Sequence, residues 1–109
     1  MSATFGQEDA RDDLAGIADQ AEEVARLMAH LSNPGRLRVL CALSDGPQSV
    51  GDLAAELGMA QPTLSQHLSR LRQADLVQST RHGTMVVNRL ADQRLSELMG
   101  TIYRLYCQR

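Results

Sequence analysis

The sequence predicts a mainly α-helical domain with one small β-hairpin, and three observations lead to this fold class. Apolar residues repeat at helical spacing through most of the 109-residue chain. The stretch from Val50 to Leu71 contains two such segments around a tight turn. After Leu76 the pattern changes to two short segments rich in β-branched residues, with a glycine between them. This order predicts a winged helix-turn-helix domain, with five helices and one wing.

Length and composition indicate one domain with a modest core. We expect residues 1–11 to be a disordered acidic N-terminus and residues 12–109 to form the winged-helix DNA-binding and dimerisation domain. No run of about 18 apolar residues occurs, so a membrane span is not expected. The acidic start lacks an apolar signal segment, which predicts a cytoplasmic protein.

The first expected helix runs from Asp12 or Asp13 to about Leu31. Its apolar residues recur at spacings of three and four, as in a seam between two helices. They are Leu14, Ile17, Ala21, Val24, Met28 and Leu31. The last expected helix begins after Asp92, ends near Cys107 and has a similar apolar set: Leu95, Leu98, Met99, Ile102, Leu105 and Tyr106. Because these faces exceed what one small core covers, we expect a homodimer through the first and last helices. Packing onto the monomer core alone is the alternative.

Three shorter helices are expected between these, and the first two have clear start signals. Asn33-Pro34 indicates a helix start, because asparagine can cap a helix and proline is tolerated in its first turn. This helix should run to Leu43, where Asp45-Gly46-Pro47 breaks the pattern. Ser49 and Asp52 then resemble a capping box that opens the first helix of the DNA-binding hairpin.

The second helix of the hairpin is expected from about Gln61 to Ala74. Gly58 ends the helix before it, and Pro62 lies in its first turn. One face carries leucines, and the other carries polar groups that can bond base edges and phosphates in a major groove. The expected DNA-contacting residues here are Gln61, Thr63, Ser65, Gln66, His67, Ser69 and Arg70, and Arg72 lies on the same face. The alternative is an ordinary helical hairpin with a solvated face.

The wing is expected to pair Val77–Thr80 with Thr84–Asn88 through a turn at 81–83. Arg81 and His82 at its tip are expected to touch phosphate or a minor groove. A purely structural wing is the alternative.

The charge distribution supports contact with DNA even though the net charge is −2. Seven acidic residues and one arginine give residues 1–23 a charge of −6, which leaves +4 for the remainder. All basic residues are arginine, whose planar fork suits phosphate. A solvated acidic tail is the alternative explanation of this asymmetry.

The chain has two cysteines, Cys41 and Cys107, and their spacing is not that of a zinc motif. No histidine near them is placed as a catalytic base, and no acid–base cluster points to an enzyme. Buried thiols that only fill the core are one interpretation. However, Arg38 and Arg104 each lie three residues before a cysteine, and a nearby positive charge favours the reactive thiolate.

Three segments together carry a family resemblance: LSNPGRLRVLCAL, VGDLAAELGMAQPTLSQHLSRLRQADLV and RHGTMVV. They resemble the ArsR-type (arsenic-repressor-type) winged-helix transcriptional repressors over roughly residues 20–107. The resemblance implies a dimer that binds a double-stranded DNA operator and blocks transcription. Metal sensors of this family carry a cysteine motif in the first hairpin helix or a carboxylate–histidine set on the last helix. This sequence has neither, so neither a metal site nor a cofactor is expected.

The two cysteine positions instead resemble the sulfide-responsive BigR/SqrR-type branch. The resemblance implies that Cys41 and Cys107 are sensing thiols, which a persulfide or polysulfide links through a di- or polysulfide bridge. Release of the operator would then derepress sulfide-metabolism genes. Two alternatives stay open: a metal or metalloid sensor that takes a third ligand from the partner chain, and a non-switching winged-helix protein-interaction module.

Overall fold

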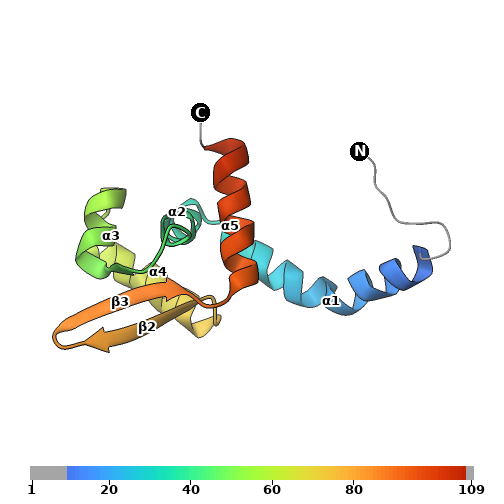
Figure 1. The fold of residues 1–109 in the computed structure, drawn as a ribbon, viewed down its shortest axis with the longest axis horizontal. Coiled ribbons are helices and arrows are strands. Elements are labelled where there is room, and N and C mark those ends of the chain that lie inside the picture. Colours follow the sequence, from blue (N-terminus) through green and yellow to red (C-terminus); the bar gives the residue numbers. More distant parts are fainter. Residues whose placement is uncertain (1–9, 108–109) are drawn as a thin grey trace.

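The computed structural model describes residues 10–107, and their side chains from residue 16 onward. Within this range it contains five helices and three strands. In chain order they are α1 (Ala10–Leu31), α2 (Pro34–Leu43), β1 (Gln48–Ser49), α3 (Val50–Leu57), α4 (Gln61–Gln73), β2 (Val77–His82), β3 (Met85–Leu90) and α5 (Gln93–Tyr106). The predicted five-helix winged helix-turn-helix is confirmed (Figure 1).

Local capping groups set the starts of three helices. The Asn33 side chain accepts from the Arg36 N–H at 3.0 Å, and Asp92 accepts from the Leu95 N–H at 2.8 Å. Ser49 accepts from the backbone N–H of Asp52 at 3.1 Å. These are the predicted caps, and each typically contributes about 1 kcal/mol.

The N-terminal boundary differs from the prediction. Helix α1 begins at Ala10, so the expectation of disorder is wrong for residues 10 and 11. Residues 1–9 lie outside the described range. Acidic residues in a first turn favour the helix dipole, which is consistent with an earlier start.

The three strands form one antiparallel sheet in the order β1-β3-β2. The two-residue strand β1 was not predicted. The wing turn also differs, because His82 pairs with Met85 and leaves only Gly83 and Thr84 between the strands. A two-residue hairpin turn needs a positive φ, which Gly83 supplies at 67°. Arg81 and His82 therefore belong to the strand and not to the turn.

Helix α2 lies at the centre of the fold. It packs against α1, α3, α4, α5 and β3, and its Val39 and Leu40 are fully buried. Burial of one such side chain contributes about 1.5–3 kcal/mol. The remaining buried apolar residues are Ala42, Leu43, Leu53, Ala54, Leu64, Leu68, Leu71, Val77, Leu95 and Met99. A shift of α2 would therefore displace side chains of the four helices that pack against it.

Helix α1 extends outward from the body, while α5 stands beside α2 (Figure 1). Near its end, α1 contributes Leu27 and Leu31 to the core. Along the rest of its length large apolar side chains are exposed, among them Ile17, Val24 and Met28. The last turns of α5 likewise expose Tyr103, Leu105 and Tyr106. The predicted partner faces are therefore exposed only in part, because Leu95 and Met99 of the predicted α5 set are buried in the core of the chain and only Leu105 and Tyr106 of that set are exposed.

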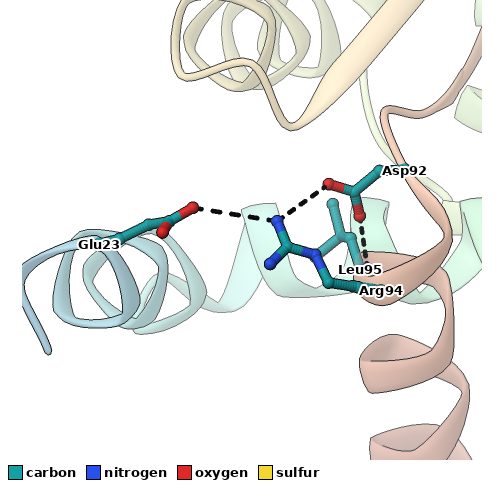
Figure 2. A network of polar contacts seen from close by, with 4 residues as sticks. All are labelled: Glu23, Asp92, Arg94 and Leu95. Atoms are coloured by element: carbon teal, nitrogen blue, oxygen red, sulfur yellow. Dashed lines mark hydrogen bonds and ion pairs between the residues drawn. The ribbon is translucent and has the colours of Figure 1, made fainter. Parts of the chain in front are cut away.

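Polar contacts between α1 and α5 lie at the start of α5. Figure 2 shows the Arg94 guanidinium between Glu23, at 3.9 Å, and Asp92, at 3.7 Å. All three side chains are largely exposed, and such surface pairs contribute about 0–1 kcal/mol. Among the described helices, none is long and apolar enough to cross a membrane.

Candidate nucleic-acid interface and thiol pair

Helix α4 has two distinct faces. Leu64, Leu68 and Leu71 are fully or almost fully buried and fix the helix on the core. The opposite face points to solvent. Its exposed side chains are Gln61, Thr63, Ser65, Gln66 and Arg70. The structure therefore presents five of the predicted DNA-contacting residues together on one accessible face, while Ser69 is half-buried at its edge.

His67 has surroundings that the sequence pattern did not indicate. Its ring lies against Gly35 in the first turn of α2, where an added Cβ would meet Nε2 and Cε1 of the imidazole. Burial lowers the pKa of His67, and the positive charges of Arg36 and Arg70 lower it further. His67 thus makes a packing contact with α2, and its contact with DNA stays a prediction.

The wing presents its two predicted tip residues on opposite faces. Side chains alternate along a strand, so Arg81 shares a face with Ser79, whereas His82 lies on the other face. The Ser79 hydroxyl accepts from Arg72 of α4 at 3.3 Å, so the face with Arg81 is the one turned towards α4. Both tip side chains are exposed. Arg81 is thus the better placed of the two to act together with α4.

Sequence reasoning missed Asn88, which is fully buried at the middle of the sheet. Its side chain accepts from Ser79 and donates to the Gln48 carbonyl. A lone asparagine among β-branched and apolar strand residues was the available signal, because a polar group is buried only where it is paired.

The two cysteines lie on helices that pack together. Cys41 is half-buried on α2, and Cys107 is exposed at the end of α5. Both are free thiols. Burial raises the pKa of the Cys41 thiol, and the charge on Cys107 raises this pKa further.

The predicted activation of Cys41 by Arg38 is wrong. The Arg38 guanidinium donates to the Leu57 carbonyl at the end of α3, and the pKa of Cys41 is raised and not lowered. The last carbonyls of a helix have no intrahelical partner, so the end of α3 offers this guanidinium a hydrogen-bond acceptor. Arg104 lies 3.5 Å from the Thr101 hydroxyl on its own helix. Within residues 10–107, no three His, Cys, Asp or Glu side chains gather to hold a metal ion.

Comparisons with known proteins agree with this geometry. Residues 33–79 match the family model for bacterial regulatory proteins of the arsR family. The biofilm growth-associated repressor of Agrobacterium fabrum is 39% identical over 94 residues, which cover 86% of this chain and 80% of that protein. This chain belongs to the arsR family. The predicted ArsR-type resemblance is confirmed, and these relatives are regulators and not enzymes.

Solved structures give the same assignment for this ArsR-family chain. The transcriptional repressor BigR from Xylella fastidiosa superposes with a TM-score of 0.78 at 36% identity, covering 91% of this chain and 98% of that one. Reduced HlyU from Vibrio cholerae superposes with a TM-score of 0.78 at 32% identity, covering 85% and 98%. The predicted likeness to BigR therefore holds in both sequence and fold.

Proposed function

We propose that this chain is a dimeric transcriptional repressor whose affinity for operator DNA is lowered by a sulfur bridge between Cys41 and Cys107. One observation carries the proposal: the two cysteines of the chain lie on α2 and at the end of α5, two helices that pack against each other. The likeness to proteins named as repressors supports the direction of the regulation. The likeness to an HlyU structure described as reduced supports a thiol-based switch.

DNA binding rests on the exposed polar face of α4 together with Arg81. In a dimer joined through α1 and α5, two copies of α4 would enter successive major grooves, with half-sites about one helical turn apart. The exposed apolar residues of α1 and α5 supply the surface for this dimer. A protein that binds operator DNA in a bacterium works in the cytoplasm.

The sulfur chemistry balances without an added oxidant when a persulfide is the donor. Each thiol takes one sulfur atom from a donor RSSH, which leaves as RSH, and becomes a cysteine persulfide. The exposed Cys107 reacts first because it is the more accessible thiol, whereas burial raises the pKa of the half-buried Cys41 and disfavours its reactive thiolate. The terminal sulfur of the Cys107 persulfide then attacks the inner sulfur of the Cys41 persulfide and expels HS⁻. The product is a bridge of three sulfur atoms.

The length of the bridge gives chemical selectivity. A plain disulfide requires Cα atoms within about 7 Å, and a longer link tolerates a wider spacing of the two helices. The bridge ties α2 to α5 and thereby biases the position of α4, which packs against α2. A coupling of about 3 kcal/mol changes DNA affinity by more than 100-fold. Genes for sulfide metabolism would then be derepressed.

The test compares operator binding with and without a persulfide donor for the wild type, Cys41→Ser and Cys107→Ser. All three reduced proteins should shift the upstream DNA equally, and only the wild type should release it after treatment. Mass spectrometry should show both thiols lost and one sulfur gained in the same molecule. Release by either single variant would refute the two-thiol switch.

Tight stoichiometric Zn(II) or As(III) binding that releases DNA would favour a metal sensor. No specific shift of the upstream DNA at low salt would favour a protein-interaction module.

A further inference from the structure

A line of hydrogen bonds crosses the small sheet through Asn88. Asn88 lies on the central strand β3, opposite Gln48 of β1 on one side and Ser79 of β2 on the other. The Ser79 hydroxyl donates to Asn88 Oδ1 at 2.6 Å, and Asn88 Nδ2 donates to the main-chain carbonyl of Gln48 at 3.3 Å. Asn88 is 0% exposed, and hydrogen bonds in such surroundings are stronger than in water.

The line continues at both ends into helices. At one end, Arg72 of α4 donates to the Ser79 hydroxyl at 3.3 Å. At the other end, the side-chain amide of Gln48 donates to the main-chain carbonyl of Ala42 in α2 at 3.3 Å, so the line passes through both the backbone and the side chain of Gln48. Ala42 directly follows Cys41. The same Gln48 amide donates to Glu56 of α3 at 2.9 Å. Polar contacts therefore connect the turn of Cys41 with the last turn of α4.

We propose that Asn88 is a positioning residue that couples α2, and with it the state of Cys41, to the wing and to α4. The inference rests on the proposed thiol switch and specifies how that switch reaches DNA. A bridge that pulls α2 towards α5 moves the Ala42 carbonyl. Because a fully buried polar group that loses its partner costs about 1–3 kcal/mol, Asn88 keeps its bonds to the Gln48 main-chain carbonyl and to Ser79 during this movement. The movement reaches Arg72 through the exposed hydrogen bond that it donates to Ser79.

Ser79→Ala is the sharpest variant, because it removes the hydroxyl that joins Asn88 to Arg72 and leaves the apolar core untouched. Thr80→Val is the matched control. Thr80 lies on the opposite face of the same strand, and its hydroxyl accepts from Arg89 at 2.7 Å, outside the line. Ser79→Thr keeps the hydroxyl and serves as the rescue variant.

The measurement is the ratio of operator affinities in the reduced and the persulfide-treated protein. In the wild type we expect a ratio in the usual range for allosteric coupling, about 5- to 150-fold. In Ser79→Ala this ratio should fall about threefold or more, which is the scale of one hydrogen bond. Thr80→Val and Ser79→Thr should keep the wild-type ratio. Asn88→Leu should lower the ratio at least as far as Ser79→Ala does.

Two failures are distinguishable. A wild-type ratio of one, with the bridge formed, overturns the proposed thiol switch together with this inference. A wild-type ratio that Ser79→Ala leaves unchanged overturns the inference alone, and means that the apolar packing of α2 on α4 carries the signal. Ser79→Ala decides between these outcomes even if Asn88→Leu does not fold.

Discussion

The start of α5 offers a prediction in which two roles of one carboxylate can be separated. Asp92 caps the helix by accepting from the Leu95 N–H at 2.8 Å, and its other oxygen lies 3.7 Å from Arg94 (Figure 2). Loss of an N-cap costs about 1 kcal/mol. The ion pair is exposed on both sides and 3.7 Å long, which puts it towards the weak end of the range of about 0–1 kcal/mol for surface pairs. The cap should therefore dominate.

We expect Asp92→Ala to lower the free energy of unfolding by about 1 kcal/mol. Asp92→Asn keeps an oxygen for the cap but loses the charge, and should cost much less. Glu23→Gln removes the other weak partner of Arg94 and should be close to neutral. Urea unfolding at one fixed protein concentration measures these differences, because the stability of the proposed dimer would depend on concentration. Equal losses in Asp92→Ala and Asp92→Asn would show that charge, and not capping, stabilises this helix start.

Three further predictions concern the polar face of α4, the wing and the proposed dimer. Because the pKa of His67 is lower in the folded protein, the unfolded chain takes up this proton first as the pH falls. The free energy of unfolding should therefore decrease as the pH drops below about 6.5 and level off below the folded-state pKa. His67→Gln should flatten this part of a pH–stability curve, and an unchanged curve would contradict the assignment. Gln66→Ala should lose discrimination between operator and random DNA, whereas Arg81→Ala should weaken binding to both and reduce the salt dependence of affinity. Equal effects of the two changes in binding titrations would refute these roles. Met28→Glu places a charge on the exposed apolar face of α1 and should shift the sedimentation coefficient towards that of a monomer. An unchanged sedimentation profile would exclude this face from the interface.

The parts of the fold that sequence predicts well are those that local chemistry decides. Asn33, Ser49 and Asp92 cap their helices with bonds to residues three positions away, and Gly58 ends α3 with a left-handed backbone. The leucines of α4 repeat at helical spacing, so the accessible face follows directly from the buried one.

The parts that sequence does not predict depend on residues far apart in the chain. Strand β1 exists only because β3 lies beside it, and Asn88 matters only because Gln48 and Ser79 flank it in space. The guanidinium of Arg38 reaches a carbonyl at Leu57, a choice that spacing along one helix cannot reveal. For the same reason the direction of the pKa shift at Cys41 required the packed structure.

The aromatic residues at the end of α5 make the molecule its own optical probe. The chain contains no tryptophan, and its only two tyrosines, Tyr103 and Tyr106, lie in the last turns of the helix that ends at Cys107. Intrinsic ultraviolet emission from this protein therefore originates within a few residues of one thiol, and its intensity can follow events at that sulfur without any attached dye.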